Sequence, residues 1–247
     1  MAAESANARR SKSLKSKALS TNSASRFVVA ILLLAFFFIA FKFFVASLLL
    51  VRPENTISQW EKDKQQASLE DTKQILTRIE LAEKSAVGAF TINDPIKINE
   101  LKSRLFLINT TLEQSQNHYK QAHQFSLQLT ELAPSHYLGW TLLAQTQLSN
   151  PDYNWNDQNA LTRALETGPF ERKNQVRLLP LLIEHWSLLN AKNQELARVM
   201  LNSSLNELHT AYVAIRAMRK FNNASTFSEL LASSKYHERL AKELSKR

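Results

Sequence analysis

Cysteine is absent from this chain of 247 residues. Without a thiol, the chain has no disulfide framework, no cysteine nucleophile and no cysteine-ligated metal. Glycine and proline are scarce, with three and six residues respectively. Few turn residues, together with many Leu, Ala, Gln, Glu and Lys residues, predict an all-α protein.

Sequence signatures of catalysis are also missing. The chain contains no glycine-rich phosphate loop, nucleophile elbow or HExxH motif, and its aspartates include no D-x-D pair after residue 51. His118 and His123 lie five residues apart, so on a helix they point to different sides rather than pairing for a metal. We therefore predict that the chain is not an enzyme and has no catalytic residue, cofactor or metal site.

Basic charge is concentrated at one end of the chain, whose formal net charge is +9. Residues 1–26 carry six Lys or Arg and one Glu, whereas the portion from residue 53 onward carries 23 cations and 21 anions. A nucleic-acid-binding protein needs a concentrated basic face to displace counterions. We therefore expect no nucleic-acid partner.

The chain has one long apolar run, at residues 27–51, in which 19 of 25 residues are Phe, Leu, Val or Ile. These residues contribute roughly −6 to −11 kcal/mol to membrane insertion, and the single charge, Lys42, costs about 2.5 to 3.5 kcal/mol. As a helix the run is about 37 Å long, enough to cross a hydrocarbon core of about 30 Å. The run is too long for a signal peptide and no Ala-x-Ala follows it, so we predict an uncleaved transmembrane helix in the lipid bilayer.

The flanking charges predict the orientation of this anchor. More Lys and Arg residues precede the run than closely follow it, so the positive-inside rule places the N-terminus in the cytoplasm. We predict a single-pass protein of the inner membrane with a periplasmic C-terminal domain. Residues 1–26 are rich in Ser, Lys and Arg without an apolar period, which predicts a disordered basic cytoplasmic tail.

Lys42 has two interpretations. A charge inside the membrane is a candidate contact to a partner helix. Alternatively, its long side chain reaches the nearer interface by snorkelling.

Residues 52–93 are predicted to form a membrane-proximal helix and linker. Arg52-Pro53 is expected to end the transmembrane helix, because proline disfavours helical geometry in the residue before it. Apolar residues at three-and-four spacing between Asn55 and Lys84 predict a stalk-like helix, about 45 Å long if continuous. Asp94-Pro95 then has the chemistry of a helix start, and it opens the predicted helical domain at residues 94–247.

A partial tetratricopeptide signature occurs within this domain. Trp140, Leu143 and Ala144 match the first helix of the repeat, and a second set of residues matches its second helix: Leu161, Ala164 and Pro169. The match predicts an antiparallel hairpin in which Trp140 and Leu161 pack across the two helices. We therefore predict a TPR-like arrangement of helical hairpins, resembling an α-solenoid.

Two groups of residues are candidates for a binding surface. Tyr153 and Trp155 lie in the polar turn NPDYNWND, where exposed aromatic rings would stack on a sugar. The second group forms a basic corner after the Gly168-Pro169 turn and would attract an acidic glycan: Arg172, Lys173 and Arg177. The same corner also fits a solvated helix start, with Gly168 in the left-handed conformation that ends the preceding helix.

The segment from Ala164 to Leu201 carries a resemblance to a known family. Its features are an apolar helix ending in Trp186 and a set of flanking residues: Leu165, Gly168, Pro169, Glu171, Leu189 and Arg198. Together with the basic tail and the anchor, this segment resembles the VpsP-type polysaccharide-biosynthesis proteins. The resemblance implies one N-terminal anchor, a degenerate tetratricopeptide-like domain and a role in making or exporting an extracellular polysaccharide. It also implies membrane-protein partners in a polysaccharide-assembly complex, and it makes the glycan a candidate ligand.

Three functions remain open at this point. The first is a non-catalytic, membrane-anchored accessory or scaffold protein of exopolysaccharide biosynthesis. The second is a TPR-type scaffold for another envelope complex, such as one for cytochrome maturation or cell division. The third is an unrecognised envelope enzyme.

Overall fold

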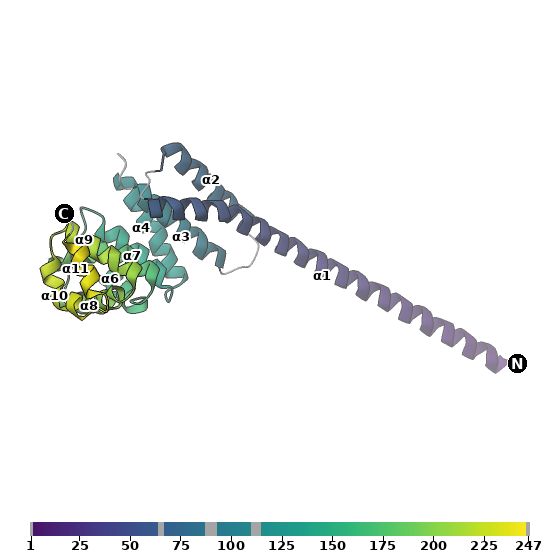
Figure 1. Cartoon of the computed structure of the whole chain (residues 1–247). Coiled ribbons are helices and arrows are strands. Elements are labelled where there is room, and N and C mark those ends of the chain that lie inside the picture. The colour runs from purple at the N-terminus through teal and green to yellow at the C-terminus, as the bar shows by residue number, and fades with distance from the viewer. Residues whose placement is uncertain (1, 64–66, 87–92, 110–114, 246–247) are drawn as a thin grey trace.

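The structure is a computed structural model that describes residues 2–63, 67–86, 93–109 and 115–245. All regular elements within these residues are helices, which confirms the predicted all-α class (Figure 1). The α-helices are α1 (Ala2–Asp63), α2 (Leu69–Ala86), α3 (Asn93–Ile108), α4 (Ser115–Leu132), α5 (Tyr137–Leu148), α6 (Asn159–Thr167), α7 (Arg172–Glu184), α8 (Ala191–Leu205), α9 (Leu208–Lys220), α10 (Ser228–Ser233) and α11 (His237–Leu244). Two short 3₁₀ helices accompany them, η2 (Trp186–Leu188) and η3 (Ala224–Phe227).

Helix α1 continues from the apolar run into the folded domain, with Pro53 inside it. The predicted helix end at Arg52-Pro53 is therefore wrong. A proline inside a helix removes one hydrogen bond and tends to bend the helix rather than end it when packing holds both sides. Leu50 and Ile57, which flank Pro53, are buried in one core and hold the helix through this point.

The same helix also includes residues 2–26, where the composition predicts a disordered tail. The structure differs from that prediction. The segment has no glycine or proline, and its alanines, lysines and arginines have good helix propensity, so it extends the helix that follows.

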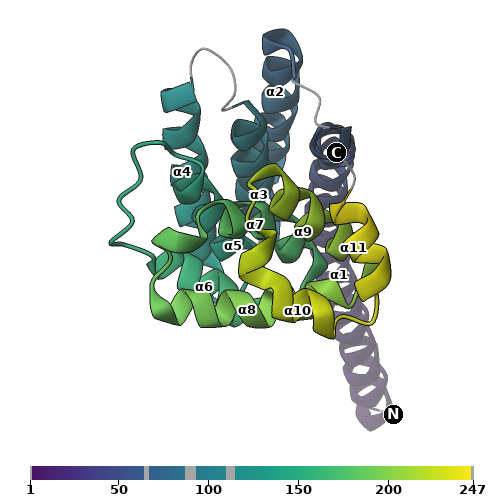
Figure 2. The same cartoon turned by 60° about the vertical axis from the view of Figure 1, so that its left-hand side comes forward.

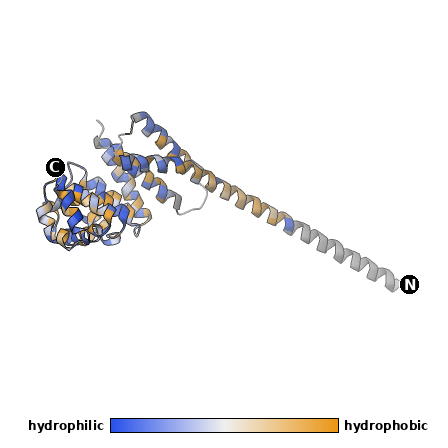
Figure 3. Ribbon diagram, viewed as in Figure 1, coloured by the Kyte–Doolittle hydropathy of each residue, from blue (hydrophilic) through white to orange (hydrophobic). Residues whose placement is uncertain are grey.

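Exposure changes along α1 near Phe44. The apolar residues from Phe27 to Phe44 are exposed, and Lys42 among them is half-buried. Ala46 and Leu50, by contrast, are 1% and 6% exposed. Figure 3 shows the run as a continuous hydrophobic segment of α1. This part of the chain is long and apolar enough to cross a membrane, as the sequence predicts. Within the predicted span at 27–51, one side of the helix is covered by protein from Ala46, whereas Leu48 and Val51 are 62% and 54% exposed.

Helices α1, α2 and α3 form a three-helix unit with its own core. Helix α2 folds back along the end of α1, so Ile75, Ile79 and Ala82 are buried together with Leu50 and Ile57. The predicted continuous stalk is therefore wrong. Its apolar stripe is buried against α1, and this burial stabilises the reversal of the chain after Asp63.

Helix α3 shares that core through Ile98, Leu101 and Leu105. The boundary predicted at residue 93 consequently does not separate two cores. Helix α4 packs along α3, where the hydroxyl groups of Ser103 and Ser126 lie 2.6 Å apart. The α4–α5 region then connects this unit to the rest of the chain.

Helices α5 to α11 enclose the largest core, and Figure 2 shows α6 to α11 gathered on one side of the α1–α4 helices. Helices α5 and α6 pack against each other as the partial repeat predicts. Leu161 is fully buried in this core and Trp140 packs against it.

Gly168 ends α6 with φ −145° and ψ 44°, so the predicted left-handed conformation is wrong. Glycine is needed at this position for a different reason. A Cβ atom at this position would lie 2.9 Å from Cβ of Tyr137, at the start of α5. Glycine is therefore required for close approach of α6 to α5.

Candidate functional site: the ionic junction between anchor and domain

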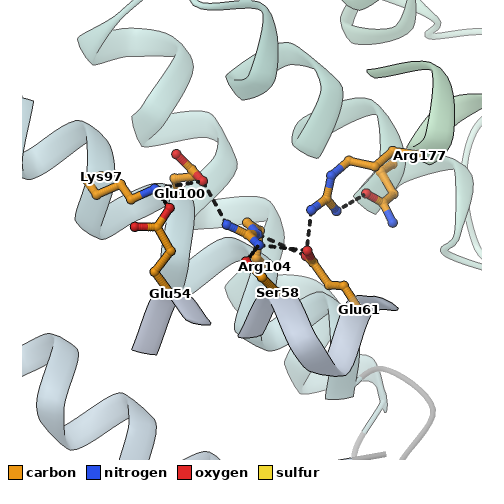
Figure 4. A network of polar contacts seen from close by, with 8 residues as sticks. Glu54, Ser58, Glu61, Lys97, Glu100, Arg104 and Arg177 are labelled. Carbon is orange, nitrogen blue, oxygen red and sulfur yellow. Dashed lines mark hydrogen bonds and ion pairs between the residues drawn. The ribbon is translucent and has the colours of Figure 1, made fainter. Parts of the chain in front are cut away.

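A network of charged side chains joins α1 to α3 and α7 (Figure 4). Two ion pairs set the register of α1 against α3: Glu54 lies 2.6 Å from Nζ of Lys97, and Glu61 lies 2.7 Å from Nη2 of Arg104. Both acids and both bases are seven residues apart, which is two turns of helix. The two helices therefore run parallel and are fixed along their length at two points.

Glu61 is the centre of this network. Its two oxygens accept hydrogen bonds from Arg104 Nε at 3.0 Å and from Arg104 Nη2 at 2.7 Å. Oε1 of Glu61 also accepts a bond of 2.6 Å from Nη2 of Arg177 on α7. Bidentate arginine–carboxylate bonds are short, strong and geometrically specific, so the last turn of α1 is held by two separate helices.

Arg104 has two further hydrogen-bond partners. Its Nη1 donates to Glu100 at 3.0 Å and its Nη2 donates to the hydroxyl of Ser58 at 2.9 Å. The side chains of Arg104 and Glu100 are only 7% and 8% exposed. Lys97 completes the group at 3.4 Å from Glu100, so three carboxylates face three cations and their formal charges cancel. Charges at this depth require such pairing.

The environment keeps the central pair ionised. Burial by itself would raise the pKa of Glu61, but the hydrogen bonds and charges of Arg104 and Arg177 outweigh it and lower this pKa. Burial would likewise lower the pKa of Arg104, but Glu61 and Glu100 outweigh it and raise this pKa. Both groups are consequently charged at neutral pH and attract each other in a poorly solvated setting.

The arrangement is suited to holding helices together. Arg177 also donates to the side-chain oxygen of Gln145 on α5 at 3.2 Å, which connects the network to the largest core. The two carboxylate oxygens of Glu61 are occupied by arginine donors, so this side chain holds the end of α1 in place against α3 and α7. We name this group the ionic junction; it comprises Glu54, Ser58, Glu61, Lys97, Glu100, Arg104 and Arg177.

The structure separates the predicted basic corner. Arg177 turns toward Glu61 and its side chain is 15% exposed, so its predicted place on a basic surface is wrong. Arg172 is exposed and lies 3.5 Å from Glu207, and Lys173 is exposed beside it. Arg177 follows Arg172 by five residues, which places it about 140° around the axis of α7, so it points to a different neighbour.

Tyr153 and Trp155 are half-buried, so the prediction that both rings are exposed is wrong. Both pack against the largest core, with their rings 5.2 Å apart, and the Trp155 ring lies 4.8 Å from that of His185. Burial and the charge of Asp157 raise the pKa of Tyr153 to about 12, and its hydroxyl donates to the carbonyl of Asp157. The pair closes the α5–α6 loop over the core; its binding of a sugar stays a prediction.

Lys42 lies near the domain-side end of the exposed run. Its Nζ atom is 5.2 Å from the centroid of the Phe38 ring, one turn earlier in α1. Ala46 and Leu50 follow at four and eight residues, so Lys42 shares the helix face that the domain covers further along. Lys42 therefore lies directly before the covered part of α1. Snorkelling and contact with a partner helix both stay predictions for this residue.

Sequence reasoning did not identify the ionic junction. Its signal was nonetheless present, because Glu54 and Glu61 have the same seven-residue spacing as Lys97 and Arg104. Equal spacing of opposite charges on two helices is typical of a parallel pair. Recognising it required knowing that α2 reverses the chain between them.

Within the described residues, no three His, Asp or Glu side chains come together to hold a metal ion. The chain matches no protein-family model, no curated protein and no solved structure.

Proposed function

We propose that the chain is a non-catalytic, membrane-anchored helical scaffold that presents a binding surface at a fixed height and orientation relative to the bilayer. One observation carries this proposal. Helix α1 passes from the candidate span into the domain core without an intervening loop, and the ionic junction fixes its last turns to α3 and α7.

Rigid attachment distinguishes a scaffold from a simple tether. A flexible linker confines a domain near the membrane and raises its effective concentration, but it leaves the domain free to rotate. A continuous, packed helix also prevents this rotation, so one fixed face of the domain points toward a neighbouring membrane protein. Helical hairpins such as α5–α6 provide extended surfaces for that contact, as in tetratricopeptide-type domains.

The process that we propose is exopolysaccharide biosynthesis or export. Its support is the resemblance carried by the segment from Ala164 to Leu201, including Gly168, Pro169 and Trp186. The proposed partner is a membrane protein of the polysaccharide-assembly complex. The charge bias supports an inner-membrane location with the N-terminus in the cytoplasm and the helical domain in the periplasm.

Complementation of a gene deletion tests the proposal with four versions of the chain. These are the full-length protein, a version with an unrelated apolar helix replacing Phe27–Phe44 in the same register, a version with about six Gly and Ser residues inserted between Phe44 and Val45, and a released periplasmic domain. The insertion uncouples the domain while keeping the membrane tether. Membrane levels are matched before polymer is measured.

Full-length protein and the replaced-helix version are expected to restore the amount and length of extracellular polysaccharide. The Gly/Ser insertion and the released domain are expected to restore them poorly. Full restoration by the insertion would contradict the rigid scaffold. A deletion that leaves the polymer unchanged would contradict the exopolysaccharide role and favour a scaffold for another envelope complex.

The orientation is tested by a reporter that is active only outside the cytoplasm. Fused after Arg247 it is expected to be active, and fused within residues 1–26 it is expected to be silent. The reverse pattern would overturn the periplasmic placement of the domain.

A further inference from the structure

Basic side chains gather on α9, on α11 and at the turn before α11. Six cations occur in residues 208–245 against three acids, and α9 itself contains no acidic residue. The two helices pack against each other at the opposite end of the molecule from the N-terminus (Figure 1). We call this surface the α9–α11 face; its defining residues are Tyr212, Arg216, Arg219, Arg239 and Lys242.

Arg239 is held in place by an aromatic neighbour. Its Nε atom donates to the hydroxyl of Tyr212 at 2.7 Å, and its guanidinium carbon lies 5.5 Å from the centroid of that ring. Among the described residues, neither Nη atom has a hydrogen-bond acceptor. The exposed guanidinium is thus oriented through one edge while its other donors remain free for a planar anion.

Arg216 is a neighbour of the same tyrosine on the surface of α9. It follows Tyr212 by four residues on α9, is exposed, and pairs with no carboxylate among the described residues. Arg219 follows Arg216 by three residues on α9, and its Nη1 donates to the backbone carbonyl of Glu243 at 3.2 Å. Two arginines with available donors therefore flank Tyr212, and a third closes the seam between the helices.

The composition of the face indicates the kind of ligand. Within the described part of residues 208–245, no large hydrophobic side chain is exposed. Tyr212, which is half-buried, is the one aromatic residue among those that define the face, so the face lacks the cluster of large apolar anchors found at the centre of most protein interfaces. A lipid surface is also a poor fit, because the face lies beyond the packed end of α1, away from the membrane span (Figure 1).

We propose that the α9–α11 face binds a carboxylated polysaccharide, with Arg216 and Arg239 each binding a sugar carboxylate. A uronate polymer is flexible, well solvated and lined with planar carboxylates, which match arginine donors. This inference goes beyond the proposed function, which requires only a protein partner. Binding is expected to weaken as salt rises, since the charges are exposed.

The test uses full-length protein in nanodiscs of phosphatidylcholine, with polygalacturonate oligosaccharides as the probe and their methyl-esterified form as the uncharged control. The binding variant is Arg216→Gln/Arg239→Gln. The matched variant, Lys84→Gln/Lys120→Gln, removes the same charge from exposed positions on α2 and α4. Tyr212→Phe keeps the ring but removes the hydroxyl that orients Arg239. Circular dichroism verifies that each variant is folded.

The unmodified protein is expected to bind polygalacturonate and not its ester. The double arginine variant is expected to lose at least tenfold in affinity, Tyr212→Phe severalfold, and the matched variant less than twofold. Equal losses in the two double variants would overturn the proposal, as would equal affinity for poly-glutamate, which would assign the face to an acidic protein. If the unmodified protein binds no polygalacturonate although it complements the deletion, this inference is contradicted and the scaffold function stands.

Discussion

At the scale of single residues, Gly168 is required because a side chain has no room at this position, and its backbone conformation does not demand glycine. Its negative φ is accessible to alanine, but an added Cβ would lie 2.9 Å from Cβ and 3.0 Å from Cγ of Tyr137. The neighbouring atoms are close to the backbone and have little freedom to move. The contact between the end of α6 and the start of α5 therefore depends on this glycine.

Gly168→Ala is expected to destabilise the protein by about 1 to 3 kcal/mol, because overpacking forces the two helices apart. Urea unfolding followed by circular dichroism in detergent measures this difference. Gly139→Ala is the matched control: its Cβ would lie 3.2 Å from Cγ of Leu129, and alanine gains helix propensity inside α5. A larger loss for Gly139→Ala than for Gly168→Ala would contradict this explanation.

Glu61 gives the ionic junction a dependence on pH. Its folded pKa lies below the ordinary value of 4.5, so the pairing contributes stability that is fully present above pH 4.5 and lost as pH falls through the lowered pKa. Glu61→Gln leaves Arg104 and Arg177 without their shared carboxylate. We expect a loss of about 3 to 5 kcal/mol at pH 7, as for breaking a buried pair.

The prediction is tested by unfolding the full-length protein in detergent between pH 7 and pH 3. The unmodified protein is expected to lose more stability over this range than Glu61→Gln, because only the former has this pair to lose. Glu195→Gln, at an exposed position on α8, is the control and should lose less than about 0.5 kcal/mol at pH 7. Similar values for the two variants would show that the junction contributes little.

At the scale of helices, strong local periodicity was sufficient to predict the α5–α6 hairpin. The repeat signature around Trp140 and Leu161 combines apolar spacing with small residues, so both sides of the seam are visible in the sequence. Leu161 is fully buried as expected, and Ala164 is buried beside it. The contacts in this hairpin are close in the chain, which is why sequence reasoning reached them.

Leu161→Ala is expected to destabilise the protein by about 2 to 5 kcal/mol, through lost apolar burial and the cavity left behind. Thermal and urea unfolding in detergent measure the change. Leu132→Ala removes the same atoms from a side chain that is 49% exposed, and its cost should be smaller. A cost below about 0.5 kcal/mol for Leu161→Ala would contradict the buried hairpin seam.

Local rules failed where distant contacts decide the outcome. Pro53 is a good helix-ending signal by itself, yet α1 continues because Leu50 and Ile57 are buried on either side of it. The stripe that includes Leu76, Ile79 and Ala82 predicted a helix correctly, but nothing local showed that this helix packs back onto α1. Tyr153 and Trp155 looked exposed because their sequence neighbours are polar, although their rings pack on residues from other helices.

At the scale of the whole molecule, the candidate membrane-spanning helix and the domain share one continuous element. From Ala46 onward one side of α1 is covered by protein, and its final turns contribute Leu50 and Ile57 to a core with α2 and α3. Glu61, in the last turn, is bound from both α3 and α7. The all-helical class and the long apolar helix followed from periodicity and composition, whereas this coupling depends on contacts between residues up to 116 positions apart.

Distance measurement between two spin labels tests this coupling most directly. The chain has no cysteine, so introduced cysteines at Phe41 on α1 and Val199 on α8 are the only labelling sites, and both side chains are exposed. Double electron–electron resonance in nanodiscs is expected to give one narrow distance distribution for the otherwise unmodified chain. Arg104→Gln should broaden it, and Glu195→Gln should leave it unchanged. A broad distribution in the unmodified chain would contradict a rigid connection between anchor and domain.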